Sequence, residues 1–108
     1  TGMKIDFHRR KFVLANKTGG MSGPAIKPVA VRMVYQVSHA CKLPIIGMGG
    51  ILTGEDAIEM MMAGATMVSV GTANFHNPRA TMEVLDGMKA YMERYHIEDI
   101  NEIIGCID

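Results

Sequence analysis

Apolar residues recur along this chain at two spacings, and each spacing predicts a different kind of element. In three segments they return every third or fourth position, which places them on one face of an amphipathic helix. These helices are predicted to begin at Pro28, after Thr53 and after Asn77-Pro78. Between them, residues 45–48 and 67–70 are consecutive apolar runs, which predict strands covered on both faces.

The same spacing predicts which side chains the helices bury. The buried positions are expected to be Ala30, Met33, Val34, Val37 and Cys41 in the first helix, Ala57, Ile58, Met61 and Met62 in the second, and Met82, Leu85, Met88, Met92 and Tyr95 in the third. Thr53 is a good N-cap for the second helix, because Glu55 and Asp56 follow in the first turn. Gly64 is a natural stop for that helix.

The remaining segments complete the order of elements. Residues 1–11 are polar and basic and indicate an exposed loop, residues 12–15 are apolar, and residues 16–24 form a glycine-rich loop. A last short helix is expected over about residues 99–104.

Strands that alternate with helices indicate right-handed parallel units, and two such strands make an incomplete sheet. The predicted fold class is therefore α/β, with residues 1–108 as the C-terminal portion, the last strands and helices, of a single TIM (β/α)8 barrel domain whose N-terminal part is absent.

Composition narrows the possible functions. The 11 basic and 11 acidic residues cancel, so the chain has no basic excess that would attract nucleic acid or an anionic membrane. No apolar run approaches the roughly 20 residues that span a bilayer. Cys41 and Cys106 are too far apart for a metal site and are expected to be buried thiols. These features predict a reduced, soluble, cytoplasmic protein, and the start at Thr1 suggests that it was cut from a longer one.

Both predicted strands end in glycine. Gly49 and Gly50 follow the first strand, and Gly71-Thr72 follows the second. In a barrel, the loops after the last two strands commonly bind phosphate, because glycine lets several backbone N–H groups approach the anion. The alternative is that these glycines only form tight turns. The spacing fits neither a P-loop nor a dinucleotide fingerprint.

A third glycine cluster, residues 18–24, precedes the first helix. A flexible loop is an equally simple interpretation of this cluster. Lys27 follows it and could either neutralise an anion or be exposed to solvent.

The run LANKTGGMSGPAIKP, residues 14–28, closely resembles the bacterial class 1B dihydroorotate dehydrogenases, and residues 29–34 continue the likeness. The segments IIGMGGI and VGTA match the phosphate-binding strand ends of that family in order and spacing. Many FMN and phosphate barrels share these strand-end glycines, so GGMSGPAIKP is the specific part. The resemblance implies an FMN-binding barrel, with Gly23, Gly49, Gly50, Gly71 and Thr72 on flavin-binding positions.

The resemblance also implies an activity, the oxidation of dihydroorotate to orotate in pyrimidine (UMP) biosynthesis. The cysteine base of the family lies upstream of the region seen here, so no catalytic residue is assigned. Neither Cys41 nor Cys106 matches the sequence context of that base. The family implies a homodimer paired with a subunit that holds FAD and an iron–sulfur cluster and passes electrons to NAD. Two alternatives stay open: another FMN barrel, such as a dihydropyrimidine or dihydrouridine reductase, and a non-catalytic phosphate-binding half-barrel.

Overall fold

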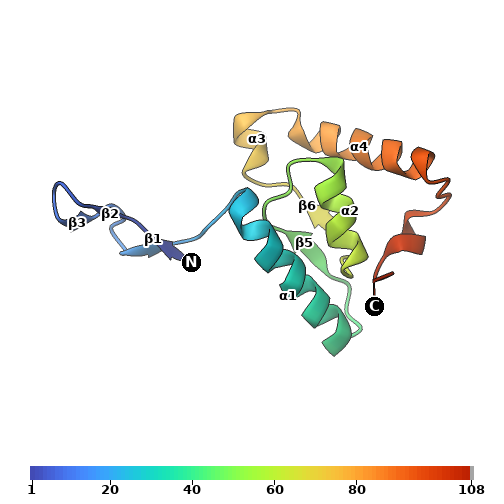
Figure 1. The fold of residues 1–108 in the computed structure, drawn as a ribbon, viewed down its shortest axis with the longest axis horizontal. Coiled ribbons are helices and arrows are strands. Elements are labelled where there is room, and N and C mark those ends of the chain that lie inside the picture. The colour runs from blue at the N-terminus through green and yellow to red at the C-terminus, as the bar shows by residue number, and fades with distance from the viewer. Residues whose placement is uncertain (108) are drawn as a thin grey trace.

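The computed structural model describes residues 1–107 as a β-ribbon that projects from an α/β body (Figure 1). The ribbon pairs β1 (Gly2–Met3) with β4 (Thr18–Gly19) and β2 (Ile5–Asp6) with β3 (Lys11–Phe12), both antiparallel. The body follows in the order η1 (Pro24–Ile26), α1 (Lys27–Ala40), β5 (Ile46–Met48), α2 (Gly54–Met62), β6 (Met67–Ser69), α3 (Ala73–His76), α4 (Ala80–Arg94) and η2 (Ile100–Ile103).

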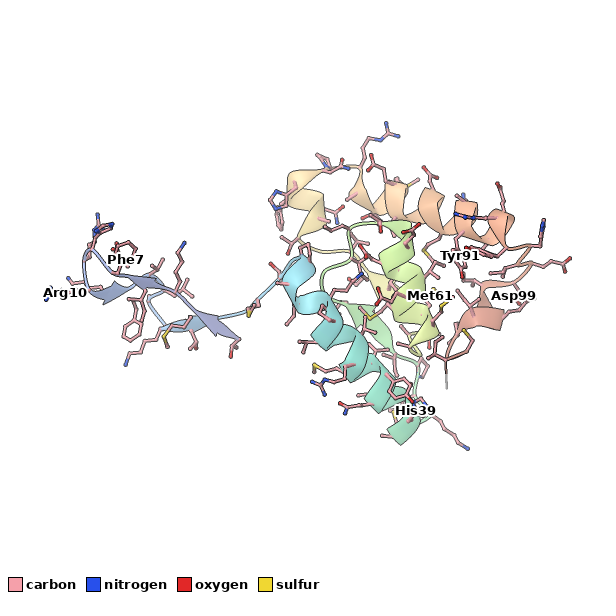
Figure 2. The ribbon with its side chains drawn as sticks, viewed as in Figure 1. Phe7, Arg10, His39, Met61, Tyr91 and Asp99 are labelled. Atoms are coloured by element: carbon pink, nitrogen blue, oxygen red, sulfur yellow. The ribbon has the colours of Figure 1, made fainter. Side chains whose placement is uncertain are left out.

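The ribbon corrects the prediction of an exposed loop over residues 1–11. Exposure is confirmed, since Phe7 and Arg10 project at the far end of the ribbon (Figure 2), but the backbone is paired. The turn is closed by Asp6, whose carboxylate accepts hydrogen bonds from the N–H groups of His8 and Arg9, each at 3.0 Å. Met3, Ile5 and Phe7 alternate with polar residues, which is the period of a strand and was the available signal.

In the body, the predicted order of helices and strands is confirmed. β5 and β6 pair in parallel, with Ile46 opposite Met67 and Met48 opposite Ser69. Thr53 caps α2 through a capping box with Asp56, as its position predicted. Gly64 ends the helix region with a φ of 127°, which a residue with a side chain rarely adopts. The α/β class therefore holds for the described residues.

The core lies between the strand pair and α2, and between α2 and α4. Met60, Ala57 and Ala65 have no exposed surface, and Gly47 of β5 faces Met60 with no room for a side chain. The strands are covered on this face alone. On the other face Ile46, Met48 and Met67 are 54%, 58% and 53% exposed, so within this chain one face of the strands is uncovered, as expected for an incomplete sheet.

The predicted inner face of α4 is also wrong in part. Ala80 and Val84 are buried and Met88 is half-buried, whereas Met82 and Leu85 are exposed. The cause is a backbone contact between helices. A Cβ on Gly54 would lie 2.4 Å from the carbonyl carbon of Gly87, so α4 turns its small residues toward α2. Met61 and Tyr91 pack together farther along the same interface (Figure 2).

The inner face of α1 is narrower than predicted. Ala30 and Val34 are buried, but Met33 and Val37 are exposed. Cys41 and Cys106 are exposed as well, which overturns the prediction of buried thiols. Cys41 lies beyond the last helical turn in extended backbone, where the helical spacing no longer determines its direction. No helix within residues 1–107 has the length and apolar character that crossing a bilayer requires.

Candidate phosphate-binding site

The three glycine segments converge on one cavity of about 640 Å³. It opens at the ends of β5 and β6 and is bounded by the turn into α1. Every residue predicted for flavin contact lines it: Gly23, Gly49, Gly50, Gly71 and Thr72. The structure thus brings together residues from three separate loops, although their role toward flavin stays a prediction.

Gly50 is held where no side chain fits. Its φ is 75°, and a Cβ there would lie 2.7 Å from the carbonyl oxygen of Gly23 and 2.8 Å from Cβ of Lys27. Gly49 has a φ of 118°, and its Cβ would lie 3.1 Å from that of Ala30. The loop after β5 therefore packs its backbone directly against the start of α1, with glycine required by both conformation and space.

This arrangement brings backbone amides to the cavity. Gly49 and Gly50 line it just after β5, and Thr72 and Ala73 line it after β6. Such a group of amide donors from two strand ends suits an anion, because each N–H carries a partial positive charge. The cavity is therefore a candidate site for an anion such as phosphate.

The loop after β6 is shaped by Asn74, which the sequence reasoning missed as a site residue. Its Nδ2 donates to the carbonyl oxygen of Val70 at 2.9 Å, and its Oδ1 accepts from Oγ1 of Thr81 at 2.9 Å. The backbone N–H of Asn74 also donates to the carbonyl oxygen of Gly71, at 3.0 Å. An asparagine directly after a strand-end turn was the available signal, because its side chain readily bonds nearby backbone. Asn74 shapes this loop without lining the cavity itself, whereas the polar side chains of Ser22, Ser69 and His76 do line it and were also missed.

Lys27 behaves differently from both earlier expectations. It neither faces the cavity nor points freely into solvent, because its Nζ lies 2.5 Å from Oδ1 of Asp56 and 2.8 Å from Oε2 of Glu59. The hydrogen bonds that Lys27 donates to these carboxylates raise its pKa and outweigh the effect of partial desolvation. Burial by itself raises the pKa of Asp56, but the hydrogen bonds from Lys27 and from the amides of Leu52 and Thr53 outweigh it and lower that pKa.

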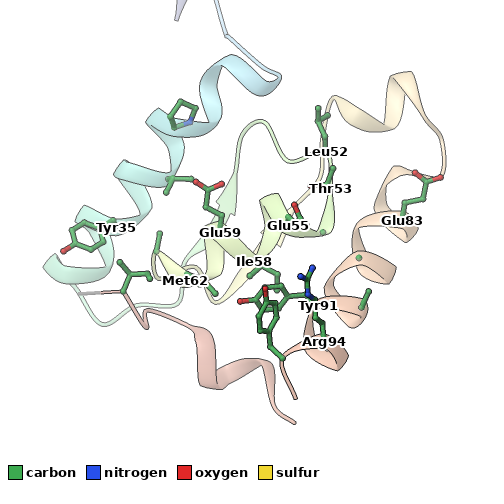
Figure 3. Close-up of a pocket in the computed structure, with 18 of the residues that line it drawn as sticks. Tyr35, Leu52, Thr53, Glu55, Ile58, Glu59, Met62, Glu83, Tyr91 and Arg94 are labelled. Carbon is green, nitrogen blue, oxygen red and sulfur yellow. The ribbon is translucent and has the colours of Figure 1, made fainter. Parts of the chain in front are cut away.

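A larger hollow, of about 1180 Å³, lies among α1, α2 and α4 (Figure 3). Its walls carry Glu55, Glu59 and Glu83 beside Tyr91 and Arg94. The carboxylates would repel a phosphate, and the backbone amides at the strand ends line the smaller cavity instead. The smaller cavity between the glycine loops is therefore the candidate site for an anion.

Nothing within residues 1–107 suggests a metal centre. No group of three or more His, Cys, Asp or Glu side chains in this part of the chain is placed to hold an ion.

Comparison with known proteins places the chain in a family. The family model for dihydroorotate dehydrogenase matches residues 1–92. The chain belongs to this family. The resemblance read from residues 14–28 and from the strand ends is thereby confirmed.

Curated relatives agree with this assignment. The chain is 66% identical over 107 residues to the dihydroorotate dehydrogenase B (NAD(+)), catalytic subunit, of Lachnoclostridium phytofermentans, covering 99% of this chain and 36% of that protein. It is 72% identical over 104 residues to the protein of the same name from Alkaliphilus oremlandii, covering 96% of this chain and 34% of the relative. The chain thus spans about a third of the length of the curated relatives it matches.

Solved structures show the same likeness. A crystal structure of DHODH from Eimeria tenella in complex with ferulenol superposes with a TM-score of 0.76 at 27% identity, over 98% of this chain and 29% of that one. The ligand-free form from the same organism superposes with a TM-score of 0.76 at 30% identity, over 84% and 26%.

Proposed function

We propose that this chain is the phosphate-binding segment of an FMN-dependent dihydroorotate dehydrogenase of the NAD-dependent B type. The observation that carries the proposal is the cavity in which Gly23, Gly49, Gly50, Gly71 and Thr72 meet. Backbone amides at the ends of β5 and β6 suit a phosphate group, and Gly49 and Gly50 carry no side chain that would shield them. The family membership of the chain supports FMN as the molecule that carries the phosphate.

In this proposal the segment binds and orients, and the rest of the protein carries out the chemistry. FMN, when bound, would supply the redox centre that takes up hydride as dihydroorotate becomes orotate. The amides after β5 and β6 would hold the phosphate end of the cofactor, and the Thr72 hydroxyl would add a donor. Neither exposed cysteine lines the cavity, so neither has a position suited to a catalytic base.

The architecture we propose for the parent protein is a (β/α)8 barrel, of which this chain forms the last strands and helices. The exposed apolar face of β5 and β6, with Ile46, Met48 and Met67, supports this, because the inner face of a barrel is filled by such side chains. The parent would be a cytoplasmic homodimer with a second subunit that carries FAD and an iron–sulfur cluster. The word "subunit" in the names of its relatives supports a partner.

Two measurements test the proposal. The full-length protein should be isolated with FMN and should oxidise dihydroorotate, and Thr72→Val should weaken FMN binding about tenfold or more through loss of one hydrogen bond to a charged group. The purified 108-residue chain should show no turnover and should associate with copies of itself through the uncovered strand face. A full-length protein that binds no flavin, or a catalytically active isolated chain, would contradict it.

A further inference from the structure

Lys27 lies where two of the glycine segments meet, yet it does not face the cavity. It is the first residue of α1, directly after Ile26, which does line the cavity. Its ammonium group is instead held by Asp56 at 2.5 Å and Glu59 at 2.8 Å. Because two carboxylates already balance this charge, the lysine is not available as the counter-ion of a bound phosphate.

Asp56 carries the connection onward to the glycine loop. While its Oδ1 accepts from Lys27, its Oδ2 accepts from the N–H groups of Leu52 at 3.0 Å and Thr53 at 3.1 Å. Leu52 follows directly after residues 49–51. A continuous set of charge-assisted hydrogen bonds therefore runs from the first residue of α1 to the backbone just beyond the glycines.

The start of α1 also touches the glycine loop directly. The missing side chain of Gly50 leaves space that is taken up by the carbonyl oxygen of Gly23 and by Lys27 itself. A shift of α1 relative to α2 would thus move the Gly23 turn against the amides of Gly49 and Gly50. The side chains of Lys27 and Asp56 are only 24% and 17% exposed, so water screens their attraction less than that of a surface pair.

We propose that Lys27 is a positioning residue for the phosphate cavity: paired with Asp56, it fixes the spacing between the Gly23 turn and the Gly49–Gly50 amides without touching the anion. The inference rests on the proposed function, since it takes the ligand to be the phosphate of FMN. Several amides bind one phosphate well only when they are held in place beforehand. Glu59, whose side chain is 51% exposed, contributes less than Asp56.

The test uses the full-length apoprotein that carries this segment, titrated separately with FMN and with riboflavin, which has the same ring system without the phosphate. Lys27→Met should weaken FMN binding about tenfold, or about 1.4 kcal/mol, and should change riboflavin binding by less than about twofold. Lys27→Arg keeps the charge and should retain most of the FMN affinity. Lys42→Met, at an exposed lysine, is the matched control and should change neither affinity.

Unchanged FMN affinity in Lys27→Met would overturn the inference, and so would an equal loss for FMN and riboflavin, which indicates a general effect on the fold. If Lys27→Met does not fold, Asp56→Asn takes its place, because the amide oxygen can still accept from Leu52 and Thr53 while the ion pair is lost. A wild-type protein that binds FMN no better than riboflavin would contradict the phosphate site itself, and the role of Lys27 with it.

Discussion

The two glycine loops on the cavity place different demands on their glycines. After β5, Gly49 and Gly50 have φ values of 118° and 75°, and neighbouring atoms occupy the space where their side chains would be. After β6, Gly71 is not among the residues with positive φ, and no atom lies within 4 Å of the position its Cβ would take. The first loop is packed against α1, whereas the second is open.

This difference separates two reasons why a position needs glycine, namely packing within the fold and close approach of a ligand. At Gly50 the fold alone requires it, so its presence says little about a ligand. At Gly71 the described residues impose no such requirement. A ligand that approaches the backbone closely would supply the missing reason. Gly71 is therefore the more informative residue for phosphate binding, and four substitutions separate the two cases.

The largest effect is expected for Gly50→Ala. The new Cβ would lie 2.7 Å from the Gly23 carbonyl oxygen on a backbone with positive φ, so both strain and steric conflict oppose the native loop. We expect a loss of about 3 kcal/mol in the free energy of unfolding of the full-length protein, measured by urea denaturation. Gly20→Ala is the control, because it has open space and no positive φ. Equal stability of the two variants would show that the loop relaxes freely.

Gly49→Val comes next. Its φ of 118° strains any side chain, and contact with Ala30 at 3.1 Å requires a small shift, so we expect about 2 kcal/mol of destabilisation together with loss of bound flavin. Flavin content is measured from absorbance after purification. Met48→Leu, a substitution of similar volume at the neighbouring position, should be mild. Normal flavin content in a folded Gly49→Val protein would remove this amide from the phosphate site.

A smaller effect is expected at Asp56, which supports the packed loop from behind. The lowered pKa of Asp56 means that its contribution is present above the ordinary carboxyl pKa and is lost as the pH falls through the lowered value. The raised pKa of Lys27 means that the lysine loses its charge only in strongly alkaline solution. At neutral pH, Asp56→Asn should therefore cost on the order of 1 kcal/mol through loss of the ion pair with Lys27. The difference from the wild type should shrink in acid, and a difference that is constant with pH would contradict this role.

The sequence predicted the parts of the molecule that local rules determine. Thr53 caps α2 as expected, Gly64 ends that helix region, and both apolar runs form strands. The convergence of Gly23 with the strand-end glycines required the family resemblance as well, because residues 18–24 carry no pattern that locates them in space.

What the sequence could not predict depends on contacts between distant elements. The face of α4 is set by the contact of Gly87 with Gly54, and helical spacing alone favoured the larger apolar residues. Lys27 and Asp56 are 29 positions apart, so their pairing follows only once the two helices are placed. The exposed cysteines show the same limit, since apolar neighbours in sequence did not become neighbours in space.

The smallest change in stability is expected for Gly71→Ala. This variant tests whether the open loop is a ligand site. Since the added methyl group meets no atom within 4 Å and the backbone φ is not positive, the free energy of unfolding should change by no more than about 0.5 kcal/mol. If the phosphate of FMN approaches this backbone, the methyl group should still weaken FMN binding by about tenfold or more, which fluorescence titration of the full-length apoprotein measures. Gly20→Ala, equally open but on the ribbon, should leave both quantities unchanged. Lost stability in Gly71→Ala would show that the fold does require this glycine, and full FMN affinity would show that the phosphate does not reach it. The prediction thus stands only if binding falls while stability does not.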